Sequence, residues 1–221
     1  MIDFLKSVPV FYGVDETVLK SACGKFFRHA YIKNQTILES GDKGDFLGFV
    51  ISGRVKVSII SESGKEIILD YLGRGECIGE MAIFDENKRS ANVTASTPAV
   101  LALISRKDYL GYASHVPEIS FRIASVMSKR LRTANRRFES MVSMPLIRRV
   151  ADLLISCCDK SENYRVGYTQ QEMGDLLGVH RESITRVLSK MKSQGILNKA
   201  PCSSDLSINR NLLEKIYLTE S

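Results

Sequence analysis

The segment between Pro117 and Pro145 constrains the fold of this chain more than any other segment. It holds 27 residues without glycine or proline. A helix start tolerates the first proline, whereas the second disfavours helix in the residue before it. A helix of this length runs about 40 Å at ~1.5 Å per residue, which exceeds what one small domain needs. We therefore predict one long helix over residues 117–144 that joins two domains.

One face of this predicted helix is apolar. Its members recur at steps of three or four residues over nearly four heptads: Ile119, Ile123, Met127, Leu131, Ala134, Phe138 and Met141. The other faces are rich in arginine and lysine. Such a stripe either packs on the helix's own domain or pairs with its copy in a second subunit. The length of the stripe favours the second interpretation, a homodimer.

Length and charge set the first limits on function. A chain of 221 residues suits two small domains or one large one, and a net charge of +6 favours an acidic partner. Charge alone does not separate DNA from RNA or a membrane surface. No apolar run reaches membrane-spanning length and no secretory signal is visible, so we expect a cytoplasmic protein without a membrane partner. The five cysteines include no CxxC pair, so we expect no metal centre.

Two periodicities divide the first half of the chain. Residues 1–27 predict short helical segments, whereas from His29 to Leu103 the apolar residues alternate with a period of two. The predicted strands are Ala30–Ile32, Thr36–Leu38, Phe46–Ile51, Val55–Ile60, Glu66–Tyr71, Ala91–Ala95 and Val100–Ile104. Glycine-centred turns separate them, which indicates an antiparallel sandwich or jelly roll in an α+β chain.

The same region has none of the patterns of common nucleotide-dependent enzymes. Strands and helices do not alternate as in a Rossmann fold, and neither GxGxxG nor GxxxxGK[ST] occurs. A cupin-type metalloenzyme would need a cluster of histidines, but His29, His115 and His180 are scattered along the sequence. We therefore predict that the protein is not an enzyme.

A segment within the β region departs from strand alternation. Gly79 and Glu80 begin what reads as one helical turn, and a polar loop then leads to Arg89 and Ser90. Free N–H groups at a helix start, an arginine fork and a hydroxyl all favour a phosphate, while Glu80 can accept hydrogen bonds from a ribose hydroxyl. Two interpretations are open: a phosphate–ribose site inside the barrel, or a solvated loop with a surface Arg–Glu pair.

These residues belong to a wider pattern. Gly41-Asp42-x-Gly44-Asp45, Gly53-Arg54-Val55 and GEMAIF followed by RSA resemble the cyclic-nucleotide-binding domain of the cyclic-AMP receptor protein/FNR family of bacterial regulators. The resemblance covers nearly the whole chain. It implies a jelly-roll domain at residues 1–116, a dimerisation helix at 117–144 and a winged helix-turn-helix domain at 145–221. It also implies a cyclic nucleotide effector, with cyclic AMP expected first, and RNA polymerase as a partner.

The ligand residues follow from the same resemblance. The Gly-Glu pair is expected to hold the ribose and phosphate, and the Arg-Ser pair the cyclic phosphate. The full predicted set is Gly79, Glu80, Met81, Ala82, Arg89, Ser90, Ala134 and Asn135. Members that bind cyclic AMP contact the adenine with a Thr-Ser or Thr-Asn pair on the long helix. The corresponding positions in this sequence are Ala134 and Asn135. Alanine cannot make that hydrogen bond, so the alternative is a regulator that answers another nucleotide or acts without a ligand.

Two other sensor types of the family are not expected. The Fe–S type needs a cluster of cysteines near the N-terminus, where only Cys23 lies. The haem type replaces the Gly-Glu pair of the pocket motif, which is present here. Cys77 lies two residues before Gly79 and is expected to pack inside the barrel.

The pattern becomes helical again after Pro145. Residues 146–154 predict an amphipathic helix with Arg148 and Arg149 directed outward. The adjacent Cys157 and Cys158 continue its apolar run and are expected to pack rather than to bind a ligand.

The next segment has the pattern of a helix-turn-helix. Thr169-Gln170-Gln171-Glu172 is a capping box, and Gly178 supplies a tight turn before a second helix from about His180 to Gln194. Residues 196–208 are expected to form a β wing. Two interpretations are open here as well, a pair of packed helices with a solvated charged face or a DNA reader.

The exposed face of the second helix favours the DNA reader. Arg181 and Arg186 can bond guanine O6 and N7, and Glu182 can accept from cytosine N4. The resemblance agrees, because the cyclic-AMP-receptor branch reads TGTGA-type half-sites with R-E-x-x-x-R. The predicted contacts to double-stranded DNA are Thr169, Gln170, His180, Arg181, Glu182, Thr185 and Arg186. His180 stands where serine is common, and it is a weaker N-cap than serine.

Overall fold

The structure, a computed structural model, describes residues 1–85, 87–156, 163–164, 168–199 and 206–208. The chain divides into two compact units, residues 1–130 and residues 131–221, so the boundary falls inside the long helix. None of the helices in the described ranges has the length and apolar composition needed to cross a bilayer.

Three short helices begin the first unit: α1 (Ile2–Ser7), the 3₁₀ helix η1 (Pro9–Phe11) and α2 (Glu16–Cys23). The carboxylate of Asp15 caps α2 by accepting the N–H of Thr17 at 2.8 Å. The apolar side chains of these helices are buried against one sheet of the barrel. The short helices predicted for residues 1–27 are therefore confirmed as far as Cys23, whereas Phe27 begins the first strand.

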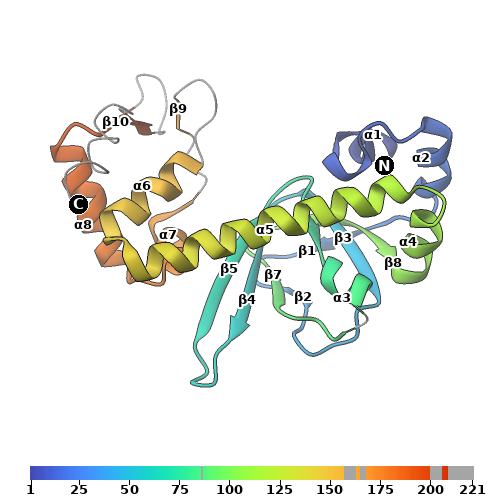
Figure 1. Cartoon of the computed structure of the whole chain (residues 1–221), viewed down its shortest axis with the longest axis horizontal. Coiled ribbons are helices and arrows are strands. Elements are labelled where there is room, and N and C mark those ends of the chain that lie inside the picture. The colour runs from blue at the N-terminus through green and yellow to red at the C-terminus, as the bar shows by residue number, and fades with distance from the viewer. Residues whose placement is uncertain (86, 157–162, 165–167, 200–205, 209–221) are drawn as a thin grey trace. The chain divides into compact units, whose positions relative to one another are not determined.

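Two four-stranded antiparallel sheets, in the orders β1-β8-β3-β6 and β2-β7-β4-β5, form the barrel of the first unit (Figure 1). The strands are β1 (Phe27–Tyr31), β2 (Thr36–Leu38), β3 (Phe46–Ser52), β4 (Val55–Ile60), β5 (Glu66–Leu72), β6 (Cys77–Ile78), β7 (Asn92–Ala95) and β8 (Ala99–Ser105). The predicted jelly roll is confirmed. The predicted bounds differ most at β1, which begins at Phe27 and ends before Ile32, whereas β3, β5, β7 and β8 differ by single residues at their ends. Strand β6 is not among the predicted strands, because two residues are too short to show alternation.

One core of the first unit lies between the two sheets. Alternate residues of the strands point inward, among them Val50, Val55 and Leu101. Gly53 makes the tight turn from β3 to β4 with a φ of +80°, and a Cβ at this position would lie 2.2 Å from the carbonyl oxygen of Pro98. Only glycine fits this turn without moving the neighbouring backbone.

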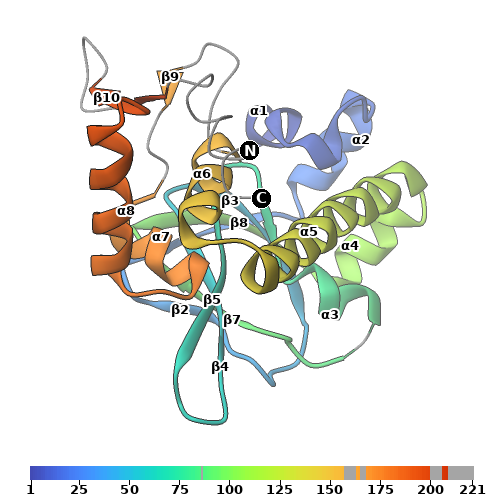
Figure 2. The same cartoon turned by 60° about the vertical axis from the view of Figure 1, so that its left-hand side comes forward.

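The predicted long helix is confirmed as α5 (Pro117–Ser143), which follows the shorter helix α4 (Arg106–Ala113). Ser105 caps α4 by accepting the N–H of Asp108 at 3.0 Å. Figure 2 shows the first turns of α5 beside α4. Both helices therefore close the same side of the first unit.

The apolar stripe of α5 has two environments. Ile119 and Ile123 are buried in a second core, together with the N-terminal helices and the outer face of the β1-β8-β3-β6 sheet. The prediction that the whole stripe faces a second subunit is therefore wrong for these two residues, because the first turns of α5 cover their own barrel. Later members of the stripe, Leu131, Phe138 and Met141, are exposed.

The second unit contains the rest of α5 and the helices α6 (Leu146–Ser156), α7 (Gln170–Leu177) and α8 (Arg181–Ser193). Its short antiparallel strands β9 (Asn163–Tyr164), β10 (Leu197–Lys199) and β11 (Leu206–Ile208) pair in the order β10-β11-β9. Helices α7 and α8 pack on each other (Figure 2). The helix-turn-helix is confirmed, and the wing is confirmed for its described strands, since residues 200–205 lie outside the described ranges.

Arg149 on α6 is directed inward, which corrects the prediction that it faces outward. Its Nη1 donates to the carbonyl oxygen of Leu177 at 3.0 Å, and its Nε is buried. Leu177 is the last residue of α7, and a carbonyl at a helix end lacks a donor from within the helix. The arginine supplies that donor. Cys157 and Cys158 lie outside the described residues.

Candidate nucleotide pocket and nucleic-acid interface

The predicted phosphate–ribose segment lies between β6 and β7. The six-residue helix α3 (Glu80–Asp85) follows Gly79 directly. Gly79 has a φ of +77°, and a Cβ there would lie 2.3 Å from Nη1 of Arg89 and 3.2 Å from the carbonyl oxygen of Phe46. The backbone conformation and the close approach of the Arg89 side chain therefore both require glycine.

Arg89 is buried, with 4% of its surface exposed. Its Nη1 donates to the carbonyl oxygen of Gly79 at 2.8 Å, and its Nη2 donates to that of Phe46 at 2.7 Å. The guanidinium carbon lies 5.0 Å from the centroid of the Phe46 ring. The buried Nε has no hydrogen-bond partner within the part of the chain that the structure describes. The side chain of Arg89, the predicted partner of a phosphate, is therefore held by two backbone carbonyls, and its Nε remains an unsatisfied donor.

The glycine-rich turn of the first motif fixes the backbone around Arg89. The Arg89 N–H donates to the carbonyl oxygen of Asp42 at 2.8 Å, and the Gly41 N–H donates to that of Arg89 at 2.9 Å. Burial lowers the pKa of the Arg89 guanidinium, while the carboxylates of Asp45, Glu80 and Asp42 act to raise it. The site therefore surrounds a buried cation with negative charge.

Glu80 is buried as well, and its partner is Arg130 on α5 rather than Arg89. Arg130 Nη1 donates to Glu80 Oε1 at 2.6 Å, and Nη2 donates to the carbonyl oxygen of Cys77 at 2.8 Å. Burial acts to lower the pKa of Arg130, but the Glu80 carboxylate and its neighbours outweigh burial and the pKa is raised. The alternative of a solvated loop with a surface Arg–Glu pair is therefore wrong.

Arg130 is absent from the predicted site. On the predicted helix it is one basic residue among several, and nothing in the spacing separates it from Lys129 or Arg132. A weak signal exists, because Arg130 follows the buried Ile123 by two helical turns and so shares its face. A charged residue on a core-facing stripe needs a buried partner.

Burial of Cys77 agrees with its predicted place in the barrel. Burial raises the pKa of its thiol to about 12, so the thiol stays neutral. A neutral thiol packed in a core is inert, which fits a structural role.

The other predicted ligand residues surround α3. Ser90 Oγ donates to the sulfur of Met81 at 3.4 Å, and both side chains are exposed. Ala82 is buried against Gly44, where an added Cβ would lie 2.3 Å from the Ala82 Cβ. The structure therefore brings together six predicted residues, which we call the α3 site: Gly79, Glu80, Met81, Ala82, Arg89 and Ser90.

Ala134 and Asn135 lie on the exposed surface of α5 in the second unit. The boundary between the units falls between them and Arg130. Their assignment as contacts to the base stays a prediction.

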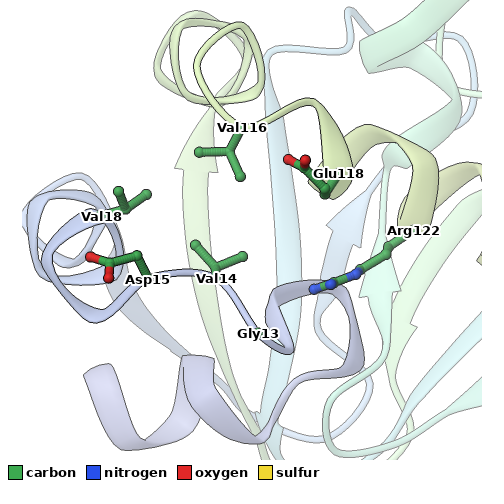
Figure 3. Close-up of a pocket in the computed structure, with 7 residues that line it drawn as sticks. All are labelled: Gly13, Val14, Asp15, Val18, Val116, Glu118 and Arg122. Atoms are coloured by element: carbon green, nitrogen blue, oxygen red, sulfur yellow. The ribbon is translucent and has the colours of Figure 1, made fainter.

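A cavity of about 300 Å³ at the start of α5 shares no residue with the α3 site. It is lined by Gly13, Val14, Asp15, Val18, Val116, Glu118 and Arg122 (Figure 3). The Arg122 guanidinium donates to the backbone carbonyls of Val10 and Tyr12. These contacts join α5 to the turn before α2, and they assign the cavity no ligand.

The predicted DNA reader begins at Thr169 in the second unit. The Thr169 hydroxyl accepts the N–H of Glu172 at 3.2 Å, and the Glu172 carboxylate accepts the N–H of Thr169 at 2.7 Å. The predicted capping box is therefore confirmed. Gly178 ends α7 with a φ of +67°, which lets the chain turn into α8.

Helix α8 has one apolar and one polar face. The buried residues are Ile184, Leu188 and Met191, and the exposed residues include Arg181, Glu182, Thr185, Arg186 and Lys190. His180 occupies the N-cap position but makes no side-chain cap hydrogen bond. Thr185 contacts Gln170 of α7. The polar face therefore presents the donors and acceptors that base edges in a major groove require.

Two family models match the chain. The model of the cyclic nucleotide-binding domain matches residues 28–115, and the model of the Crp-like helix-turn-helix domain matches residues 148–215. The first match contains the α3 site and the second contains α7 and α8.

Curated relatives and solved structures agree with these matches. The cAMP-activated global transcriptional regulator CRP of Salmonella typhimurium is 30% identical over 77% of this chain and 84% of its own length. The solved structure of the Thermus thermophilus catabolite activator protein is 28% identical, covers 96% of this chain and 100% of its own, and has a TM-score of 0.55. FixK2 of Bradyrhizobium japonicum, at 18% identity, covers 86% and 96% with a TM-score of 0.74, and shows the likeness of fold alone.

Proposed function

We propose that this chain, which belongs to the Crp/Fnr family of transcription regulators, works as a homodimer that binds a cyclic nucleotide and a two-fold symmetric DNA site. Membership of the family rests on the two domain matches and on the curated relative from Salmonella typhimurium. Proteins of this family regulate transcription and are not enzymes, so the activity to be explained is ligand-controlled DNA binding.

The buried guanidinium of Arg89 is the observation that carries the nucleotide proposal. A buried donor without a partner costs free energy, and Arg89 Nε is such a donor among the described residues. A phosphate oxygen would accept from Nε and bring the negative charge that a buried cation favours. The match to the cyclic nucleotide-binding domain contains this residue.

We infer that Arg130 carries the effect of the ligand to α5. It stands on α5 and bonds Glu80 in the segment that contains the predicted phosphate–ribose residues, Gly79 to Ser90, which we call the pocket segment. A carboxylate has two oxygens, so a ribose hydroxyl can donate to Glu80 while Arg130 stays bonded to Oε1, and a bound nucleotide then adds to the contacts that join this segment to α5. A ligand shifts a conformational equilibrium by binding one state more tightly than the other. The contacts of the nucleotide with Glu80, and through it with Arg130 on α5, supply this difference in affinity between the two states.

Cyclic AMP is the ligand that we propose first, because the Salmonella typhimurium relative is named a cAMP-activated regulator. The second candidate is another nucleotide, or regulation without a ligand. Ala134 favours it, because its methyl group cannot hydrogen-bond to adenine.

Replacing the buried arginine tests the pocket. Arg89→Leu is expected to abolish cyclic-nucleotide binding, because a phosphate loses its charge partner and the Nε donor. This variant also leaves the carbonyls of Gly79 and Phe46 without donors, so we expect it to be less stable. The exposed Ser90 allows a milder test: Ser90→Ala is expected to weaken binding by about 1 kcal/mol without loss of stability. Calorimetric titration with cyclic mono- and dinucleotides measures both effects.

Lys88→Ala is the matched control, because Lys88 is an exposed cation in the same loop. Its affinity is expected to equal that of the wild type. A wild-type protein that binds no cyclic nucleotide at millimolar concentration would contradict the ligand-gated function.

The exposed part of the α5 stripe supports a homodimer. Leu131, Phe138 and Met141 are large apolar side chains without cover in the monomer, and they recur at helical spacing. A second copy of α5 offers a stripe of the same kind, as a two-fold interface requires. We propose that α5 pairs with its copy along this segment.

We propose that α8 enters the major groove and reads a TGTGA-type half-site. Arg181 and Arg186 are exposed and can donate to guanine, and Glu182 can accept from cytosine. Two copies in a dimer would read two half-sites one helical turn apart. A regulator of this kind acts beside the chromosome, so we place it in the cytoplasm with RNA polymerase as a partner.

Base readers and phosphate contacts on α8 should respond differently to replacement. Glu182→Ala is expected to relax the preference at one base pair of each half-site, with a loss of about 1–3 kcal/mol of discrimination. Lys190→Ala should weaken binding to all sequences alike and reduce the salt slope by roughly one unit. Selection from random DNA, followed by salt titrations, measures both. If the wild type enriches no palindrome with or without nucleotide, α8 is not the reader.

A further inference from the structure

Met81, the second residue of α3, places a thioether beside the proposed phosphate contact. Its side chain is exposed, at 45%. Its sulfur accepts a hydrogen bond from Ser90 Oγ at 3.4 Å. The direction of this bond is fixed by chemistry, because a thioether carries no proton and the serine hydroxyl carries one. The hydroxyl that the site is proposed to offer to a phosphate is therefore directed at a sulfur atom.

The contact between Met81 and Ser90 is one that a phosphate can replace. A thioether sulfur is a weak acceptor, whereas a charged phosphate oxygen forms a shorter and stronger hydrogen bond with a hydroxyl. Both side chains are exposed, so a ligand can reach them. The affinity for a phosphate therefore depends on how weakly the sulfur of Met81 holds the Ser90 hydroxyl.

Oxidation of the thioether changes the strength of this contact. When a peroxide attacks methionine, one of its oxygen atoms bonds to the sulfur as the O–O bond breaks. The sulfur loses two electrons, and hydrogen peroxide is reduced to water. The product is methionine sulfoxide, a polar side chain. The sulfoxide oxygen carries partial negative charge and accepts hydrogen bonds strongly, so it would hold the Ser90 hydroxyl more firmly than the sulfur does.

Exposure singles out Met81 as the residue of the pocket segment that an oxidant reaches. Met81 and Met141 are the exposed methionines, at 45% and 49%, and the other methionines are buried or half-buried. Met141 belongs to the α5 stripe, which the proposed dimer would cover. Cys77 is buried, and burial raises the pKa of its thiol to about 12, so it is not the reactive sulfur of this segment.

We propose that Met81 is an oxidation site and that its sulfoxide lowers the affinity for a cyclic nucleotide by keeping the Ser90 hydroxyl from the phosphate. Met81 thus acts through Ser90. Methionine sulfoxide reductases reverse the oxidation, so the effect is reversible. This inference rests on the proposed nucleotide site and adds a second signal to it, an oxidant of the peroxide class.

Calorimetric titration of the full-length protein before and after treatment with hydrogen peroxide tests the inference. The probes are cyclic AMP, cyclic GMP and cyclic di-GMP. A thiol reductant follows the peroxide, which reverses disulfides and sulfenic acids but leaves sulfoxides. Mass spectrometry of the tryptic peptide 75–88, in which Met81 is the only methionine, detects the added oxygen atom.

The oxidised wild type is expected to bind about three- to tenfold more weakly, the value of one hydrogen bond. The loss should be similar for every nucleotide that binds, because the contact is to the phosphate and not to the base. Treatment with methionine sulfoxide reductase should restore the affinity. The midpoint of thermal unfolding should stay the same, since the side chain is exposed.

Three variants show whether the effect passes through Met81 and Ser90. Met81→Leu has no sulfur to oxidise, so its affinity is expected to be the same before and after peroxide. Ser90→Ala has already lost the hydroxyl, so oxidation should lower its affinity by less than about twofold more. Met141→Leu is the matched control, because it removes the other exposed methionine and should keep the full response.

Three results would overturn this inference alone. The wild type with oxidised Met81 could bind as tightly as before. Met81→Leu could lose as much affinity as the wild type, which would place the effect at another residue. The losses from oxidation and from Ser90→Ala could add fully, which would mean that the sulfoxide does not act through Ser90. A wild type that binds none of the three nucleotides before oxidation overturns the proposed nucleotide site and this inference together.

Discussion

Replacing Arg130 with methionine is expected to lower the free energy of unfolding of the first unit by about 3–5 kcal/mol. The Glu80 side chain is 8% exposed, and Arg130 is its only ion-pair partner among the described residues. Arg130→Met therefore leaves a buried carboxylate unpaired and removes the donor to the Cys77 carbonyl. Hydrogen exchange of the β3 and β8 amides measures the stability of this unit without interference from the second. Cyclic-nucleotide affinity should fall in the same variant.

A second substitution separates charge from packing. In Glu80→Gln/Arg130→Met the buried charge is gone, so most of the lost stability is expected to return. Arg130→Lys keeps the charge but lacks the two-nitrogen fork, so it cannot reach Glu80 and the Cys77 carbonyl together. If Arg130→Met leaves amide exchange in β3 and β8 unchanged, the ion pair does not hold the pocket segment against α5.

Phe138→Asp is expected to separate the dimer and to reduce affinity for a two-half-site DNA by roughly 10²–10⁴-fold. Phe138 is 73% exposed in the monomer and lies in the apolar stripe of α5. Two-fold symmetry brings both copies of the substitution into one interface, where each buries a charge without a partner. Sedimentation measures the assembly, and titration with duplexes carrying one or two half-sites measures the coupling.

The matched control is Phe121→Asp. Phe121 is on the same helix and similarly exposed, at 77%, but lies about 100° from Phe138 around the helix axis. It should leave the oligomeric state unchanged. Sedimentation of Phe138→Asp as a tight dimer would move the interface away from this stripe.

The helix-turn-helix could be predicted almost completely from the sequence, because its signals are local. The capping box of Thr169 and Glu172 spans four residues, and Gly178 gives the turn by its own conformational freedom. The polar face of α8 follows from its period. The contact of Thr185 with Gln170 could not be predicted from the sequence, because no periodicity or motif relates two exposed polar residues that are 15 positions apart.

The pocket segment was predictable in its residues but not in its arrangement. Gly79, Glu80, Arg89 and Ser90 form a motif that a reader of sequences can find. The motif alone suggests that the Arg89 guanidinium has no hydrogen-bond partner within the protein and can bind a phosphate with all its donors. In the folded chain its two terminal nitrogens are bonded to backbone carbonyls, one of them from Phe46 on β3. That contact exists only once the strands have been brought together.

The elements of the fold can be predicted from the residues alone: a jelly roll from period two, one helix over α5 from 27 residues without a breaker, and a capped helix-turn-helix. The helices and their caps depend on interactions within a few residues, whereas the strands of the jelly roll pair across long stretches of sequence, as Phe27 of β1 does with Leu103 of β8. Packing between distant segments makes Ile119 and Ile123 cover their own barrel and pairs Glu80 with Arg130, 50 residues away. Several arginines of α5 could carry that charge, and only packing brings one of them within 2.6 Å of a buried carboxylate.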